Sequence, residues 1–482
     1  MIAFADIPLA AVLGVPLTAA ALLAVIPDYR ITSQSNVLAA FITFASAASL
    51  FVIRPQSGVY LIVDDLNVVF IVLNTFVGFT TAVFSASYIA HELETGRLTP
   101  VYLRFYHAMY QLLMFSMNLA VIVNNIGLMW VAIELATLTT VLMVGIYRTH
   151  EAIEAAWKYF ILGSVGIALA LFGTILVYLA AQPVLGEGLD AMTWTLLIRR
   201  AVDFDAALLN IAFVFLMLGY GTKAGLVPLH AWLPDAHAEG PTPISAVLSG
   251  LLLNVALYAL LRFKVLLAAN ENAVTPGPLM IILGLASILF AAFMLYRRRD
   301  IKRFFAYSSI EHMGIVAFAF GIGGPVANFA GLLHMTMHSL SKSAIFFAVG
   351  HIAQVSGTQR IADIRGLSVS HPALAVVFAL CVVAIAGMPP FGIFTSEFLL
   401  LTTAFGREPM LAAIAGLGIL IAFGALIWRL QGILFGEPSN PIGKSSASLA
   451  PIYLHIAIVL IAGIWIPVPV ARWFEQVARL LG

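Results

Sequence analysis

Long apolar runs recur along almost the whole chain, and they constrain its fold more than any other feature. Hydrophobic residues make up 62% of the sequence and charged residues only 10%, with a mean hydropathy of +1.02. A soluble domain carries about 25% charged residues. An apolar run of about 20 residues crosses a bilayer as a helix, because a backbone inside lipid must satisfy its own hydrogen bonds. The sequence therefore predicts an all-α, polytopic membrane protein with about fourteen transmembrane helices.

Lysine and arginine residues are distributed unevenly between the two sets of loops. Loops after odd-numbered spans carry 12 of them, including Lys444 and the basic cluster at 297–303, whereas loops after even-numbered spans carry 6. Loops rich in lysine and arginine stay on the cytoplasmic side. We therefore expect both termini on the outer side of the membrane. The basic cluster is too short to indicate nucleic-acid binding.

Two blocks of five spans each have matching interruptions. The chain divides into residues 1–108 (the first three spans), 109–267 (spans four to eight), 268–436 (spans nine to thirteen) and 437–482 (the last span). Because five is odd, the second block enters the membrane from the opposite side, which predicts two inverted five-helix repeats. Gly225 and Pro228 interrupt the seventh span after Lys223, and the segment 387–392 interrupts the twelfth before Glu397. Broken helices at matched positions indicate a transport site.

Lys223 and Glu134 are ionisable residues within apolar spans, the seventh and the fifth. A charge near the bilayer centre costs roughly 3 kcal/mol or more. A lone buried carboxylate must be protonated or paired. We interpret Lys223 as the partner of Glu134 and both residues as functional. The alternatives are a lysine that snorkels to the interface and an inert buried ion pair.

The eleventh span holds the densest polar stripe. His334, His338 and Lys342 follow one another at four-residue steps, so all three share one broad helix face. Histidine titrates near neutral pH, which favours a stripe that passes protons from histidine to lysine. A metal site is the alternative, but this face offers no obvious third ligand, and we predict no metal. His312 extends the stripe and Glu397 ends it, unless Glu397 is a helix-end carboxylate in contact with water.

Two further groups have competing interpretations. Lys158 follows Glu154 by four residues, the spacing of a helical ion pair, so it is either a relay residue or half of a surface pair. After the seventh span comes a cytoplasmic cluster made of His230, Asp235, His237 and Glu239. Its spacing is compatible with a metal site, but the intervening prolines and glycine favour a re-entrant loop with a structural or proton-uptake role.

The sequence lacks the residues of a redox or hydrolytic centre. Its single cysteine, Cys381, cannot hold an iron–sulfur cluster or form an internal disulfide. It has no phosphate-binding glycine loop, haem-ligand pair or nucleophile triad. We therefore expect no cofactor, and since nothing in the chain supplies energy, we expect a partner to drive it.

Several segments resemble the antiporter-like proton-translocating subunits of respiratory complex I, of the Mrp cation/proton antiporters and of membrane-bound nickel–iron hydrogenases. They are 223–237 (KAGLVPLHAWLPDAH), 307–314 (YSSIEHMG), 334–342 (HMTMHSLSK) and 387–392 (GMPPFG). Segment 155–160 (AAWKYF) is most similar to the F-type membrane subunit of formate-hydrogenlyase-like group 4 hydrogenases. The resemblance implies two inverted repeats with broken seventh and twelfth helices. It also implies a coupled pair of Glu134 and Lys223, with Lys342 linking the half-channels.

The eighth span departs from this family. Many relatives carry a lysine where this chain has Asn254. Asparagine does not titrate and can only hydrogen-bond or order water. The central relay is therefore expected to depend on water or on the histidines.

These features predict a proton-translocating membrane subunit of a redox-driven complex, of hydrogenase or NADH dehydrogenase type, in a bacterial or archaeal plasma membrane. Its expected partners are the other membrane subunits of that complex. Two alternatives stay open: an Mrp-type subunit that exchanges protons for monovalent cations such as sodium, and a proton-coupled partner in inorganic carbon uptake. The expected proton path comprises Glu134, Lys158, Lys223, His230, Asn254, His312, His334, His338, Lys342 and Glu397.

Overall fold

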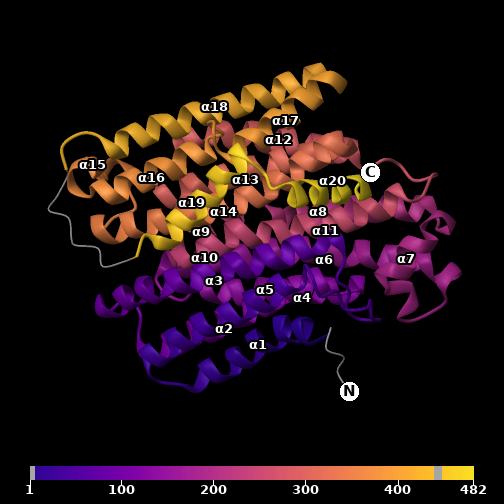
Figure 1. The fold of residues 1–482 in the computed structure, drawn as a ribbon, viewed down its shortest axis with the longest axis horizontal. Helices are drawn as coiled ribbons and strands as arrows, with labels where there is room; N and C mark the ends of the chain where they lie inside the picture. The colour runs from indigo at the N-terminus through magenta and orange to yellow at the C-terminus, as the bar shows by residue number, and fades with distance from the viewer. Residues whose placement is uncertain (1–5, 439–447) are drawn as a thin grey trace.

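The computed structural model describes residues 6–438 and 448–482, which fold almost wholly into helices (Figure 1). In chain order these are α1 (Ile7–Val25), α2 (Tyr29–Ser49), α3 (Asp65–Glu94), α4 (Pro100–Ile122), α5 (Ile126–Val144), α6 (His150–Leu185), α7 (Trp194–Arg200), α8 (Ala206–Ala224), α9 (Trp232–Glu239), α10 (Thr242–Val247), α11 (Leu253–Ala268), α12 (Gly277–Arg297), α13 (Ile301–Ile322), α14 (Gly324–Ser356), α15 (Leu367–Ser370), α16 (Pro372–Ile385), α17 (Gly392–Arg407), α18 (Pro409–Leu434), α19 (Ala450–Ile464) and α20 (Val468–Leu480). A π-helix, η4 (Leu248–Leu252), joins α10 to α11. Strand pairing in the described residues is limited to three isolated bridges.

The predicted all-α, polytopic class is confirmed. Each predicted span coincides with one helix or with two helices separated by a break. Among the described residues, nine helices are long and apolar enough to cross a membrane, or ten if the bent pair α19 and α20 counts as one span. The count of about fourteen spans therefore stays a prediction. Lys444, one of the basic residues used to predict orientation, lies outside the described residues.

Two helices were not expected from the apolar runs. Helix α7 lies in the polar connection before α8, and α20 follows α19 after a bend of 80°. Helix α20 alternates apolar side chains such as Phe474 and Val477 with charged ones such as Arg472 and Glu475. A search for long apolar runs misses such an amphipathic helix, because its hydrophobic residues cover only one face.

The polar residues of interest lie on the innermost helices. Figure 1 shows α1 and α2 at one edge of the molecule, α18 at the opposite edge, and α11 and α14 between them. The segment Thr242–Ala268, which contains α10 and α11, is buried throughout, and α13 is almost as deeply buried. The edge helices α1 and α18 expose most of their apolar side chains. The chain thus presents hydrocarbon to its surroundings and encloses its ionisable groups.

The seventh and twelfth spans are broken, as predicted. Helix α8 ends where Gly225 adopts a φ of 76°, and α16 ends just before Gly387, which has a φ of 70°. Glycine adopts this left-handed conformation without steric cost, so it commonly terminates helices. The chain resumes as α9 in the first case and as α17 in the second. Each break frees backbone groups that side chains or water must satisfy.

Glycines also allow α6 and α8 to pack with their backbones in close approach. A Cβ atom on Gly219 of α8 would lie 2.5 Å from the backbone nitrogen of Ala170 and 2.6 Å from the carbonyl oxygen of Gly166, both on α6. Small residues at such contacts are a common way for membrane helices to associate. This contact matters for the site, because Lys223 lies one turn further along α8.

The substitution Gly219→Ala is expected to destabilise the protein by about 1–3 kcal/mol, the usual cost of overpacking. The added methyl group meets backbone atoms that cannot move independently. A lowered midpoint of thermal unfolding in detergent would reveal this loss. Gly432→Ala on α18 is the control, since its Cβ would meet nothing within 4 Å. Equal unfolding midpoints for the two variants would contradict the predicted role of Gly219.

Candidate functional site

Lys223 is enclosed at the end of α8, immediately before the break. Its side chain is fully buried, and its Nζ atom has no hydrogen-bond partner among the described residues. The Nζ atom lies 4.8 Å from the ring centroid of Tyr159 and 5.8 Å from that of Trp232. These rings stack on each other with centroids 4.2 Å apart, and the Trp232 indole donates a hydrogen bond to the carbonyl of Thr222. The ammonium group is therefore held by aromatic faces and does not snorkel to the surface.

Glu134 on α5 is the charged group that interacts electrostatically with Lys223. One carboxylate oxygen of Glu134 is buried without a hydrogen-bond partner, and no ion pair within 4 Å joins the two residues among the described part of the chain. Gly163 on α6 makes room for the ammonium, since a Cβ there would lie 3.3 Å from Nζ. The two charges therefore interact across a gap rather than in a closed salt bridge, an arrangement that water can bridge.

The polar stripe of α14 is confirmed as one buried face. His334, His338 and Lys342 are all fully buried. The two histidines approach His312 of α13, with ring centroids 5.1 and 5.4 Å apart. Lys342 donates a hydrogen bond of 3.0 Å to the carbonyl of Phe305. Both ring nitrogens of His338 lack hydrogen-bond partners, so this imidazole is free to accept or donate a proton.

A chain of hydrogen bonds leads from α13 through α14 to α17. Nδ1 of His312 lies 2.9 Å from Nε2 of His334, and Nδ1 of His334 lies 2.9 Å from the hydroxyl of Ser396. Glu397, the next residue, offers a carboxylate oxygen within 4.8 Å of both imidazoles. The sequence analysis found no third ligand for a metal on the α14 face, and this was incomplete, because α13 and α17 supply one ligand each. The two imidazoles and the carboxylate are ligand types of zinc, but the imidazoles hydrogen-bond to each other here.

Glu311 is a further buried carboxylate that the sequence analysis did not place in the path. It lies on α13, one of its oxygens has no hydrogen-bond partner, and it is the charged group that acts on Lys342. Glu311 and Lys342 therefore form a second carboxylate–amine pair on different helices, like Glu134 and Lys223. The signal available was its position beside His312 inside a tenth span that is otherwise mostly apolar, but its partner lies 31 positions later.

Asn254 connects α11 to the stripe on α14. Its amide nitrogen donates to the carbonyl of Met335 at 3.0 Å and to the hydroxyl of Ser339 at 2.7 Å, while its amide oxygen is buried without a partner. It follows the π-helix η4, a wider turn that often marks functional positions. Ser339 lies three residues before Lys342. Asn254 thus contacts α14, the helix that carries Lys342, through hydrogen bonds and without a titratable group.

The remaining predicted residues lie apart from this interior row. Lys158 is 49% exposed and pairs with Glu154 at 2.6 Å and with Asp235 at 3.2 Å, which favours the surface-pair interpretation. Arg303 joins the same network through Asp235 and Glu239, each at 3.2 Å.

His230, Asp235, His237 and Glu239 do not bring their ligand atoms together as a possible metal site among the described residues. His230 packs edge-on against Phe290, and His237 stacks on Phe346. Lys302 donates two hydrogen bonds, to the carbonyls of Ala238 and Gly240, at the end of α9. The cluster is therefore a folded re-entrant segment pinned by basic residues of α13.

Comparison with known proteins gives one family match and several relatives. The family model described as "NADH:quinone oxidoreductase/Mrp antiporter, TM" matches residues 123–422. The chain is 60% identical over 472 residues to a "Hydrogenase-4 component F homolog" of Methylacidiphilum infernorum (isolate V4), covering 98% of this chain and 99% of that protein. It is 28% identical over 351 residues to the NADH-quinone oxidoreductase subunit N of Desulforudis audaxviator (strain MP104C), covering 72% and 67% of the two chains.

Solved structures share the fold at low sequence identity. A chain of an archaeal respiratory membrane complex, the membrane-bound sulfane sulfur reductase, aligns with a TM-score of 0.87 at 22% identity and covers 99% of this chain and 98% of its own. A chain of the Mrp complex from Dietzia sp. DQ12-45-1b aligns with a TM-score of 0.82 at 18% identity, covering 100% and 97%. A chain of respiratory complex I from Thermus thermophilus has a TM-score of 0.81 at 24% identity, covering 98% and 100%.

The hydrogen bonds of Asn254 predict a contribution to stability. Asn254→Ala is expected to cost about 1–2 kcal/mol, because the buried Met335 carbonyl and Ser339 hydroxyl each lose a donor. The midpoint of thermal unfolding in detergent measures this loss. Asn272→Ala is the matched control, since Asn272 is exposed and its side chain makes none of the hydrogen bonds described. A similar shift for both variants would show that the Asn254 contacts contribute nothing.

Proposed function

This chain belongs to the NADH:quinone oxidoreductase/Mrp antiporter membrane family, and we propose that it is a proton-translocating membrane subunit of a redox-driven complex of the hydrogenase or NADH dehydrogenase type. The observation that carries the proposal is the row of buried ionisable residues that the fold encloses. Lys223, Glu311, Lys342 and Glu397 are its buried members, and Glu134 is half-buried with one buried carboxylate oxygen. Histidines accompany the second carboxylate–amine pair. The near full-length similarity to a hydrogenase-4 component supports the same assignment.

The pair of Glu134 and Lys223 forms the first proton-transfer step. Lys223 has no fixed hydrogen-bond acceptor, so the charge of Glu134 has a strong influence on whether the amine holds its proton. Interacting groups of this kind titrate as a unit, so protonating Glu134 favours release of the proton from Lys223. A partner that changes the charge near Glu134 can therefore move a proton from Lys223 toward the centre of the chain.

The second half of the path repeats this arrangement. Glu311 influences Lys342 as Glu134 influences Lys223, and His338 has two free ring nitrogens on the same helix as Lys342. From there, the linked imidazoles of His334 and His312 lead toward Ser396 and Glu397. Histidine can accept a proton at one nitrogen while releasing one at the other. These groups line a route toward the second broken helix, in which water must bridge His338 to its neighbours because neither of its ring nitrogens has a hydrogen-bond partner.

Asn254 lies between the two pairs and cannot carry a proton itself. Its free amide oxygen and its bond to Ser339 can order water at the point where the protons pass from α8 toward α14. The centre of the route therefore relies on water and hydroxyl groups. We place His230 on the side that carries the basic cluster, where protons are taken up, and both termini on the outer side of a plasma membrane. Lys158 lies on the same side as a surface residue outside the path.

The alternative of a sodium-exchanging antiporter subunit would need several oxygen ligands around a carboxylate. The groups beside Glu397 include the nitrogens of His312 and His334, which suit protons better than sodium. The groups that act on Glu134 are the amine of Lys223 and the single hydroxyl of Thr137, which are too few oxygen ligands for sodium. The ligand set therefore favours proton transfer over sodium exchange. The other alternative, a role in inorganic carbon uptake, is distinguished by identifying the partner subunits.

The variant Lys223→Ala is expected to reduce coupled proton movement by roughly a hundredfold or more, the scale of losing a positioned proton-transfer group. Assembly with the partner subunits should persist, since Nζ makes no hydrogen bond that holds the fold. The measurement is acidification of vesicles that contain the whole complex, with co-purification of partner subunits as the assembly readout.

Lys158→Ala is the control for this experiment, because that lysine is half-exposed at the surface. It should retain most of the proton movement. Normal pumping by Lys223→Ala would refute the proposed path. Loss in both variants together with intact assembly would instead assign Lys158 to the path.

A further inference from the structure

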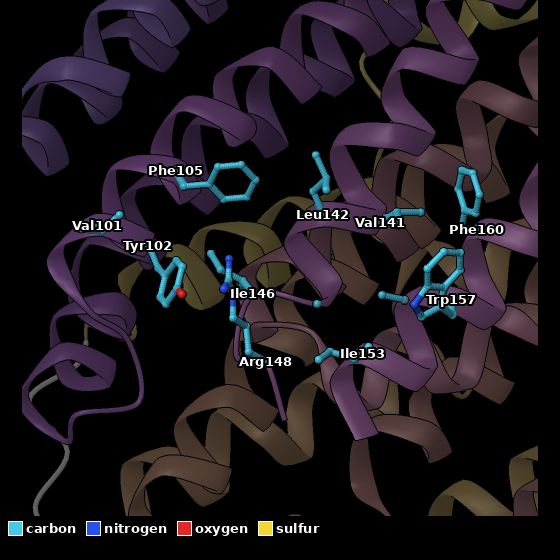
Figure 2. A pocket seen from close by; sticks show the side chains of 12 residues that line it. Val101, Tyr102, Phe105, Val141, Leu142, Ile146, Arg148, Ile153, Trp157 and Phe160 are labelled. Atoms are coloured by element: carbon cyan, nitrogen blue, oxygen red, sulfur yellow. The ribbon is translucent and has the colours of Figure 1, made fainter. Parts of the chain in front are cut away.

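An apolar groove of about 570 Å³ opens on the outside of the chain between α4, α5 and α6. Figure 2 shows Trp157 and Phe160 at one end, Leu142 above the middle, and Tyr102 with Arg148 at the other end. Leu142 and Trp157 are largely exposed, at 51% and 59%. The groove has the volume of a typical small-molecule pocket, which ranges over about 300–1,000 Å³.

Arg148 supplies the cationic end of the groove. It is the single non-glycine residue of the described chain with a positive φ, at 55°. Non-glycine residues adopt this conformation at a cost and often do so at binding sites. The guanidinium lies 4.5 Å from the ring centroid of Tyr102, and no carboxylate of the described residues is within ion-pair distance, although Glu151 follows nearby in the sequence. The groove thus ends in an exposed positive charge without an anionic partner.

The depth of Arg148 matches the headgroup level of a bilayer. It lies in the turn between the end of α5 and the start of α6. This turn is on the same side as the network of Lys158, Asp235 and Arg303, because Lys158 belongs to the first turns of α6. Trp157 and Tyr102 are amphipathic aromatic residues of the kind that gather at membrane interfaces.

We propose that this groove binds one anionic phospholipid, with its phosphate on Arg148 and an acyl chain along the groove past Leu142 toward Phe160. The charge of the phosphate complements the unpaired guanidinium, and the hydrocarbon wall suits an acyl chain. The lipid lies against α6, whose adjoining buried face carries Tyr159 and Gly163 beside Lys223. The site is separate from the proton path and does not depend on the proposed function.

Photo-crosslinking in the intact complex tests the proposal. A benzoylphenylalanine replaces Leu142, and the complex is placed in phosphatidylcholine nanodiscs with a minor fraction of phosphatidylglycerol. We expect crosslinks to phosphatidylglycerol well above its share of the lipid. Arg148→Gln should reduce this enrichment about fivefold, the effect of losing one basic contact of about 1 kcal/mol. Arg365→Gln is the control, because Arg365 is also an exposed arginine and its side chain donates only to the Ala362 carbonyl. Its segment is bonded through the backbone to the basic cluster at 297–303.

A second variant guards against an indirect effect of Arg148 on the turn. Leu142→Trp fills the groove without touching the charge, and native mass spectrometry should then find the retained phosphatidylglycerol lost. Crosslinks to a neighbouring polypeptide would show that a partner subunit covers the groove, which overturns the proposal. Crosslinks that follow bulk lipid composition, or are unchanged in Arg148→Gln, would overturn it equally.

Discussion

A charged side chain inside a membrane must be paired, solvated or neutralised, and this cost organises the interior of the chain. Lys223 and Lys342 each reduce this cost by interacting with a carboxylate on another helix. Neither lysine forms a closed salt bridge within the described structure. A tight ion pair would be electrostatically satisfied and inert. A pair separated by a gap leaves each group sensitive to the charge of the other, which is the property that proton transfer needs.

The backbone is arranged to make these gaps. Helices α8 and α16 end at glycines, so each span has freed backbone groups where a continuous helix would offer none. Gly163 leaves space for the Lys223 ammonium, and Gly219 brings α8 against α6 so that Tyr159 can face it. Around this core, basic residues at the start of α13 hold α9 by its carbonyls and carboxylates. The residues of the proposed proton path can therefore change their protonation while the packing of the helices holds them in place.

The outer surface of the chain combines plain hydrocarbon with one charged groove. The edge helices expose hydrocarbon to their surroundings, while the groove beside α5 and α6 combines hydrocarbon with the unpaired charge of Arg148. A bound anionic lipid there would complete the surface of the helices that carry Glu134 and Tyr159. The membrane itself then forms part of the support for the first carboxylate–amine pair. In the proposed function, the partner subunits of the complex supply the energy for proton movement.

The sequence by itself determined the class of fold, the two helix breaks and most of the interior row. Hydropathy, glycine and proline positions, and ionisable residues within apolar spans are local signals, and they identified Lys223, Glu134, His334, His338, Lys342 and Glu397. Only the tertiary structure showed that Glu311 faces Lys342, that Glu397 and His312 converge on His334, and that Lys158 pairs at the surface. It also revealed α20, whose apolar residues cover one face. The physical reason is that such pairings join different helices, whose relative rotation depends on packing across the whole bundle rather than on neighbouring residues.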